Sequence, residues 1–218
     1  MEISVNTKDF LEKRLYENRT ELCFIMSKYG SDKGNHHNYS TLYHYLFDNI
    51  KTEKLNVFEV GLGTNNTSVP SNMGPNGSPG ASLRGWKEYF VNSNVYGADV
   101  DSGILFEEDR ILTFFVDQTK KETIDELWGS PKLSPIDFDI IIDDGLHEFH
   151  ANRKFFENSI QKLKKGGIFI IEDISEVYLT EFNEWVKDIN TSFEFMEVLT
   201  IPIQGSVQEN NRVVIVKK

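Results

Sequence analysis

The most informative segment of this 218-residue sequence is FDIIIDDGLH, residues 138–147. A short apolar run of this kind is typical of a strand that is buried on both faces of a parallel sheet. The run stops at two aspartates, a glycine and a histidine, and open α/β sheets bind their ligands at such strand ends. The segment therefore predicts an α/β fold with a site at the carboxyl end of a central strand.

A second apolar run ends in the same way, because residues 166–173 are GGIFIIED. In a doubly wound sheet the two strands are neighbours, so both pairs of acids should emerge at one edge. Four clustered carboxylates repel one another unless a cation or protons neutralise them, and oxygen ligands suit Mg²⁺, Mn²⁺ or Ca²⁺. We therefore expect a divalent metal site here. The alternative is a set of solvated loop acids.

His147 follows Asp144 by three residues and could reach a hydroxyl group bound at such a metal. The metal would lower the pKa of that hydroxyl, and the imidazole would accept its proton. His147 is therefore the candidate general base. His36 and His37 could line the same site if their loop folds over it, but we expect both to be solvated.

The rest of the chain continues the alternation of strands and helices. Runs rich in β-formers and the helix-like segments between them indicate βαβ units and a parallel sheet that is covered on both faces. The predicted strands are 55–60, 94–100, 111–116, 137–142 and 167–171, and the predicted helices are 82–91, 119–129 and 149–164. A helix at 178–190 precedes two closely connected strands, 193–201 and 212–217, which should pair antiparallel.

Helical spacing of apolar residues also predicts helices over 7–29 and 39–50. We expect residues 1–52 to form a helical lid or cap, and residues 53–218 to form the main domain. The loop over residues 64–80 is rich in Asn, Ser, Pro and Gly and lies at the end of the first predicted strand. Structureless loops of this length are more often functional than passive, so we expect a role at the site.

The first three strand ends carry residues suited to a nucleoside ligand. Gly61 and Gly63 let the backbone approach a ligand closely, and Glu59 could pair with an ammonium group. The third glycine of the dinucleotide fingerprint is missing, which argues against a nicotinamide cofactor. Asp99 is placed to accept hydrogen bonds from ribose hydroxyls, and Asp101 is the weaker candidate. Asp117 and Gln118 are placed to contact an adenine edge.

Composition narrows the range of partners. A net charge of −11 argues against binding along a nucleic-acid backbone, which needs basic patches. No apolar run approaches the ~20 residues of a membrane span, and the first ten residues lack the pattern of a signal peptide. We therefore expect a cytoplasmic protein that binds neither nucleic acid nor membrane. Cys23 is the single cysteine, so no disulfide forms within the chain.

These motifs resemble the S-adenosylmethionine-dependent and metal-dependent O-methyltransferases of sugars, typified by the macrocin and mycinamicin methyltransferases. The related cephalosporin hydroxylase group shares the acidic pairs. The resemblance covers roughly residues 29–175 and rests on Tyr29–Gly34 with the following His and Tyr, Glu59–Gly63, Gly80–Trp86, Gly97–Asp99, Asp117–Gln118, Asp143–His147 and Ile171–Asp173. Leu146 departs from the family's usual serine at its position.

The resemblance implies a class I methyltransferase fold, Rossmann-like and doubly wound, with five parallel strands, a C-terminal antiparallel hairpin and N-terminal helices. It implies that His147 is the general base and that Mg²⁺ or Mn²⁺ is bound by Asp144, Glu172 and Asp173. Ser82 would open a helix, either capping it or holding the carboxylate of the methyl donor. The residues expected at S-adenosylmethionine are then Glu59, Gly61, Gly63, Ser82, Asp99, Asp117, Gln118 and Asp143.

The hypothesis that follows is methyl transfer to a hydroxyl of a sugar or nucleotide sugar, in a precursor of a surface polysaccharide or a natural product. Two other classes stay open: a metal-dependent enzyme of hydrolysis or phosphoryl transfer, and a non-catalytic protein that binds S-adenosylmethionine. A homo-oligomer also stays open, because no residue argues for or against it.

Overall fold

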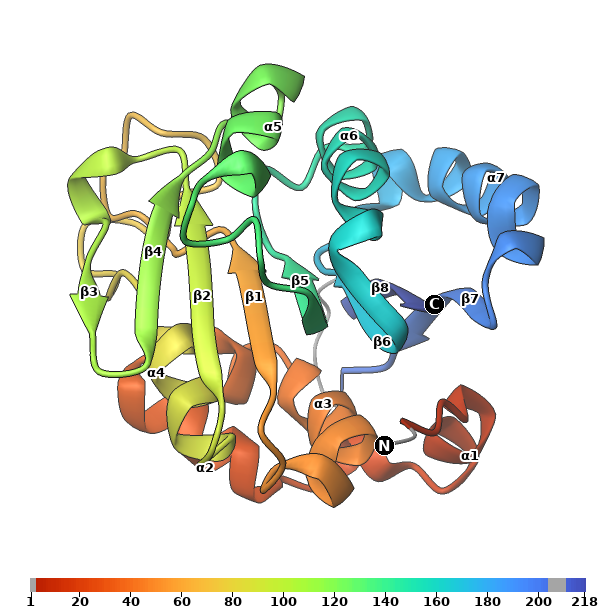
Figure 1. Ribbon diagram of the computed structural model, residues 1–218. Coiled ribbons are helices and arrows are strands. Elements are labelled where there is room, and N and C mark those ends of the chain that lie inside the picture. Colours follow the sequence, from red (N-terminus) through yellow and green to blue (C-terminus); the bar gives the residue numbers. More distant parts are fainter. Residues whose placement is uncertain (1–2, 204–210) are drawn as a thin grey trace.

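The computed structural model describes residues 3–203 and 211–218 (Figure 1). Within these residues the strands form an eight-stranded sheet with the order β3-β4-β2-β1-β5-β6-β8-β7. The strands are β1 (Asn56–Val60), β2 (Asn94–Asp99), β3 (Glu107–Glu108), β4 (Ile111–Phe115), β5 (Phe138–Asp143), β6 (Leu163–Ile171), β7 (Phe195–Ile201) and β8 (Asn211–Lys217).

The predicted topology is confirmed. Strands β4, β2, β1, β5 and β6 run parallel, and β8 pairs antiparallel with both β6 and β7. Strand β6 begins four residues earlier than the apolar run alone predicts. Strand β3 was not predicted, because an exposed edge strand of two residues has no hydrophobic pattern that sequence reasoning can detect.

Side chains of the central strands alternate between two apolar cores, one on each face of the sheet. Val57 belongs to the core that also contains residues of α1, α2, α3 and α4, whereas Phe58 belongs to the core with α5, α6 and α7. Figure 1 shows these two groups of helices on opposite sides of the sheet. The helices are α1 (Thr7–Glu12), α2 (Glu21–Tyr29), α3 (Tyr39–Phe47), α4 (Ala81–Tyr89), α5 (Lys121–Gly129), α6 (Phe149–Ser159) and α7 (Leu179–Ile189).

The prediction of one helix over residues 7–29 is wrong. Helix α1 stops at Glu12 because Arg14 adopts a left-handed backbone conformation with φ 51°, and Asn18 and Thr20 are extended. The apolar spacing continued across this break, which is why the pattern did not show it. Helices α1 to α3 share their apolar core with the sheet, and the proposed boundary at residue 52 stays a prediction.

The strand ends are in register at the edge where the site was predicted. Val60 pairs with Asp143, and Asp143 pairs with Ile171, so the three strands stop side by side. No helix in the described parts of the chain is long and apolar enough to cross a membrane.

Gly61 allows the turns after β1 and β5 to touch. Its φ is +90°, and a Cβ atom on this residue would lie 1.9 Å from the backbone oxygen of Asp144. The Asp144 amide donates to the carbonyl oxygen of Val60 at 2.9 Å, which fixes the contact. Only glycine fits both the conformation and the space.

We expect Gly61→Ala to lower the free energy of unfolding by about 3 kcal/mol, because it adds a backbone clash to left-handed strain. Gly74→Ala is the matched control, since Gly74 has φ +73° and no atom within 4 Å of its would-be Cβ. The control should lose only about 1 kcal/mol. Urea unfolding of both variants measures the difference, and equal losses would show that the contact with Asp144 does not matter.

Candidate active site

A cavity of about 510 Å³ lies at the carboxyl ends of β1, β2, β4, β5 and β6. This is the edge at which open α/β sheets bind ligands, and the volume suits a small-molecule site. The cavity is closed from other sides by residues 31–33 and by residues 69–73 of the long loop. Ten of the twelve predicted site residues line it: Gly61, Gly63, Ser82, Asp99, Asp117, Gln118, Asp144, His147, Glu172 and Asp173.

Asp144, His147 and Asp173 meet at one end of the cavity. Each offers a ligand atom, and these atoms lie within 4.8 Å of one another. His147 Nε2 is 4.0 Å from Asp144 Oδ1 and 3.8 Å from Asp173 Oδ2. His147 Nδ1 is buried and has no hydrogen-bond partner among the described residues. The imidazole therefore presents Nε2 to the two carboxylates.

His147 and Asp173 both have left-handed backbones, with φ +60° and +55°. Such conformations cost roughly 1–3 kcal/mol each for residues other than glycine and cluster at functional sites. Both residues lie in the turns that follow strands, His147 after β5 and Asp173 after β6. The turns bring the two side chains to within 3.8 Å of each other from different strands.

Sequence reasoning missed the groups that compensate the acids. The Lys33 ammonium forms ion pairs with Asp144 and with Glu172, the latter at 2.7 Å. Tyr43 donates a hydrogen bond to the other oxygen of Glu172, and Tyr39 donates to Asp173 at 2.6 Å. Lys33 and a following tyrosine were part of the motif that carries the family resemblance, but no spacing argument linked residues 33–43 to strands more than 100 residues away.

The negative charge of the three carboxylates at this end of the cavity is only partly compensated by Lys33. Burial raises the pKa of Asp144 to about 7, although the charges of Lys33 and His147 act in the opposite direction. Burial also raises the pKa of Glu172. Partial burial acts in the same direction on Asp173, but the charges of His147 and His37 lower its pKa. A hard divalent cation fits this set of donors, because it would favour the ionised form of every carboxylate.

The other half of the cavity is formed by the ends of β1, β2 and β4. Asp99 accepts hydrogen bonds from the amides of Leu62 and Asp101, at 2.7 and 2.8 Å, and still lines the cavity. Asp117 also lines it and accepts from the amide of Thr119 at 3.0 Å. These carboxylates are fixed in position by backbone donors.

Two predicted cofactor residues, Glu59 and Asp143, lie beneath the cavity lining. Glu59 accepts hydrogen bonds from Ser82 Oγ and, at 2.5 Å, from Trp86 Nε1. Asp143 accepts from the Gln118 amide at 3.1 Å and from the amide of Gly145 at 3.2 Å. Their direct contact with a ligand stays a prediction, and the contacts present show them supporting residues that line the cavity.

Ser82 does not cap a helix, which corrects one of its two predicted roles. Helix α4 begins at Ala81 after Gly80, so Ser82 is already the second helical residue. Its hydroxyl donates to Glu59 instead.

The two loop histidines differ. His36 is exposed, as expected, but the prediction that His37 is solvated is wrong. His37 lines the cavity, stacks on Tyr39 with ring centroids 5.2 Å apart, and lies 2.7 Å from Asn211 Oδ1. Its position depends on the C-terminal hairpin, which the local sequence around His37 could not indicate.

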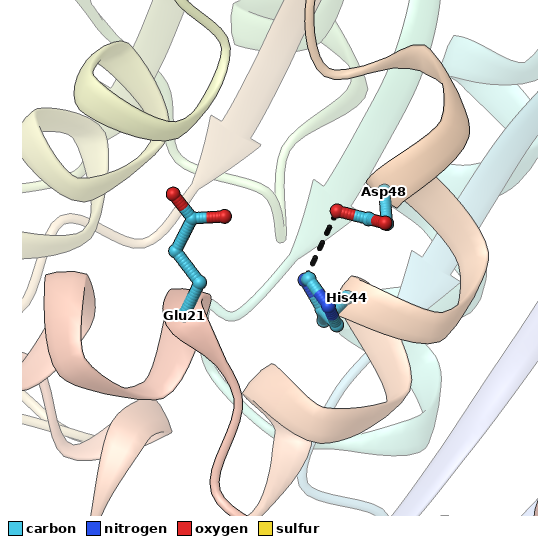
Figure 2. A group of neighbouring side chains, drawn as sticks. All are labelled: Glu21, His44 and Asp48. Carbon is cyan, nitrogen blue, oxygen red and sulfur yellow. Dashed lines mark ion pairs between the residues drawn. The ribbon is translucent and has the colours of Figure 1, made fainter.

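A second group of possible metal ligands, Glu21, His44 and Asp48, lies on α2 and at the end of α3 (Figure 2). Lys51 already compensates it, with Nζ 2.6 Å from Glu21 and 2.8 Å from Asp48. His44 Nδ1 is 3.0 Å from the Tyr89 hydroxyl. These contacts assign the group to packing between the helices.

The sequence is similar to three curated methyltransferases. It is 30% identical over 179 residues to 8-demethyl-8-alpha-L-rhamnosyl tetracenomycin-C 2'-O-methyltransferase of Streptomyces olivaceus, over 82% of this chain and 44% of the relative. It is 31% identical over 165 residues to demethylmacrocin O-methyltransferase of Streptomyces fradiae (75% and 39%) and 30% identical over 165 residues to mycinamicin VI 2''-O-methyltransferase of Micromonospora griseorubida (75% and 38%). The matched region is thus less than half the length of each relative. No protein-family model matches the sequence.

Solved structures share the fold. MycE methyltransferase from the mycinamycin biosynthetic pathway, in complex with Mg and SAH, aligns with a TM-score of 0.69 and 24% identity over 92% of this chain and 55% of that one. A second MycE structure, with Mg, SAH and mycinamycin VI, has a TM-score of 0.66 at 24% identity over the same shares of both chains. A putative ribosomal RNA methyltransferase from Plasmodium falciparum has a TM-score of 0.56 at 13% identity, over 92% of this chain and 98% of that one. The predicted class I methyltransferase fold is confirmed.

Asp143 should make the stability of the protein depend on pH. Burial raises the pKa of this carboxyl from 3.8 to about 6, so the fold favours its protonated form. The stabilisation is complete below the unfolded value and is lost as the pH rises through 6. The free energy of unfolding of the wild type, minus that of Asp143→Asn, should therefore fall by about 2 kcal/mol from pH 4 to pH 7. Urea unfolding across this range in EDTA measures it, and a constant difference would contradict it.

Proposed function

We propose that this chain belongs to the sugar O-methyltransferases that its curated relatives represent, and that it transfers a methyl group from S-adenosylmethionine to a sugar hydroxyl with the help of Mg²⁺ or Mn²⁺. The observation that supports this most is that one cavity contains both halves of such a site. Asp99 and Asp117 lie at the strand ends that suit a nucleoside, and the cluster of Asp144, His147 and Asp173 faces the same space.

The donor would lie over the ends of β1, β2 and β4. Gly61 and Gly63 have positive φ angles, of +90° and +72°, that let the backbone turn close beneath a ligand. Asp99 is fixed with both oxygens accepting backbone hydrogen bonds and has lone pairs left for ribose hydroxyls. Gln118 accepts from the Leu146 amide at 2.7 Å, which links the predicted adenine contact to the turn before His147.

The metal would be held by Asp144 and Asp173, with Glu172 as the third predicted ligand. When bound, a divalent cation supplies the charge that acidifies an acceptor hydroxyl and aligns two acceptor oxygens, typically those of a vicinal diol. Each oxygen of Glu172 accepts a hydrogen bond, one from Lys33 and one from Tyr43, so these two donors hold the carboxylate in position. Such supporting contacts are common around metal ligands.

His147 would accept the proton of the acceptor hydroxyl at Nε2. The carboxylates of Asp144 and Asp173, at 4.0 and 3.8 Å, would stabilise the imidazolium that results. The acceptor oxygen would form a bond to the methyl carbon as the carbon–sulfur bond breaks, leaving a methyl ether and S-adenosylhomocysteine. Because a sulfonium is a good methyl donor, the residues need to supply only positioning and proton acceptance.

The acceptor we propose is a small glycosylated molecule or a nucleotide-activated sugar, made for a natural product or a surface polysaccharide. The curated relatives are named for glycosylated tetracenomycin, macrocin and mycinamicin substrates, and one solved MycE structure contains mycinamycin VI. His37 and residues 69–73 lie in loops that line the cavity, and we expect them to contact the acceptor.

His147→Ala should lower turnover about 100-fold to 10,000-fold, because it removes the proton acceptor. The dissociation constant for S-adenosylmethionine should stay nearly unchanged, since His147 lies at the acid end of the cavity. Transfer of labelled methyl groups to a panel of nucleotide sugars, glycosylated natural products and polyols measures turnover, and calorimetry measures binding. His150→Ala is the control, because His150 is exposed on the adjacent helix α6. Normal turnover of His147→Ala would exclude the proposed role.

EDTA should abolish methyl transfer, and Mg²⁺ or Mn²⁺ should restore it, because the proposed metal would align the acceptor and acidify its hydroxyl. Binding of S-adenosylmethionine should survive chelation, since the strand ends that suit the donor lie apart from the acid cluster. Methyl transfer that continues after complete chelation would refute the metal mechanism. Hydrolysis of phosphate esters without S-adenosylmethionine would favour the phosphoryl-transfer alternative instead.

A further inference from the structure

Lys33 is a lysine buried inside the acidic site. Its side chain is 2% exposed, and the ammonium contacts one oxygen of Asp144 and one oxygen of Glu172. The Glu172 side chain is 1% exposed and that of Asp144 is 23% exposed. Lys33 also lines the cavity, as Asp144, His147 and Glu172 do.

The backbone around Lys33 holds the ammonium in this place. Lys33 belongs to a single turn of 3-10 helix, Asp32–Gly34, between α2 and α3. Its carbonyl accepts a hydrogen bond from Ser40 Oγ at 2.8 Å. A Cβ on Gly34 would lie 2.4 Å from the carbonyl oxygen of Cys23, so this turn is packed tightly against α2. The ammonium is therefore part of the rigid structure.

When the acids at this end of the cavity are ionised, their negative charge exceeds the positive charge of Lys33. The three predicted metal ligands, Asp144, Glu172 and Asp173, carry a charge of −3 when ionised, and Lys33 contributes +1. The remaining −2 equals the charge of one divalent ion. The oxygens that Lys33 contacts belong to two of the residues that would hold that ion.

We propose that Lys33 is the internal counter-cation of the metal site. It is a positioning residue that holds Asp144 and Glu172 together before a metal binds, and it lowers metal affinity because it competes for their oxygens. The proposal rests on the proposed metal site. A buried ion pair that loses one partner leaves an uncompensated charge, so the effect of removing Lys33 should depend on whether a metal is present.

The test is Lys33→Met in the 218-residue chain, compared with the wild type in EDTA and in saturating Mn²⁺. In EDTA the variant should melt about 10 °C lower, because Asp144 and Glu172 lose their cation. The dissociation constant for Mn²⁺ should fall about tenfold or more, and Mn²⁺ should raise the melting temperature further in the variant than in the wild type. Calorimetry and thermal unfolding provide these readouts without any substrate.

A matched control is Lys162→Met. Lys162 is also buried, but its ammonium donates to the carbonyl oxygens of Leu133 and Ser134, at 3.2 and 3.1 Å, outside the cavity lining. This variant should lose stability equally in EDTA and in Mn²⁺, with an unchanged Mn²⁺ dissociation constant.

A second variant keeps the proposal testable if Lys33→Met does not fold. Lys33→Met combined with Glu172→Gln removes one charge of each sign and leaves the Tyr43 hydroxyl an oxygen to donate to. In EDTA the double variant should be folded and should recover most of the lost melting temperature. Failure of both variants to fold would overturn the proposal, because restoring the charge balance would then have had no effect.

Two further outcomes separate this proposal from the proposed function. An equal loss of melting temperature in EDTA and in Mn²⁺, with an unchanged Mn²⁺ dissociation constant, would show that Lys33 has only a structural role. Absence of Mn²⁺ binding by the wild type would refute the metal site itself. The comparison of the single and double variants in EDTA would still decide whether Lys33 is the counter-cation.

Discussion

Asp144 and Glu172 are acids at the ends of two neighbouring strands, and the burial of Glu172 with the partial burial of Asp144 constrains the molecule around them. Buried carboxylates need hydrogen bonds and opposite charge close by. The sheet does not supply these groups. Lys33 and Tyr43 do, from the segment that contains α2 and α3, so that segment must pack against the sheet for the acids to be buried at all. The site and the N-terminal part of the fold therefore depend on each other.

Adjacent acids in the two motifs have different surroundings because the chain leaves the sheet at these positions: β5 ends at Asp143 and β6 ends at Ile171. Asp143 is the last residue of β5 and is buried against Gln118 and Gly145, whereas Asp144 lines the cavity. At the end of β6, Glu172 is turned toward Lys33, and Asp173 is turned toward His147. The duplicated acids thus provide Asp143, which supports the turn, Asp144 and Asp173, which lie near His147, and Glu172, which is paired with Lys33.

The hydrophobic pattern predicted the parallel strands, because runs such as Ile140–Ile142 are typical of a strand that is buried on both faces. It also predicted that the two acidic strand ends would meet, since that follows from the sheet alone. It did not predict the contacts of Lys33, Tyr39 or His37, which depend on how helices pack across the sheet. The pattern also did not predict the break in the first helix at Arg14, because the apolar spacing is the same on both sides of the break.

The backbone strain at His147 and Asp173 can persist because other contacts hold each turn in place. Gln118 accepts a hydrogen bond from the Leu146 amide, directly before His147. The Tyr39 hydroxyl donates to the Asp173 carboxylate and accepts from the Asp173 amide at 3.2 Å. Left-handed conformations at non-glycine residues last only where the surroundings determine them in this way. The fold itself therefore offsets the backbone strain at His147 and Asp173. Both side chains face the cavity in an arrangement that does not depend on a ligand. In the proposed reaction, an imidazole and a carboxylate that are already in position would need little reorganisation, which is the condition under which electrostatic stabilisation is most effective.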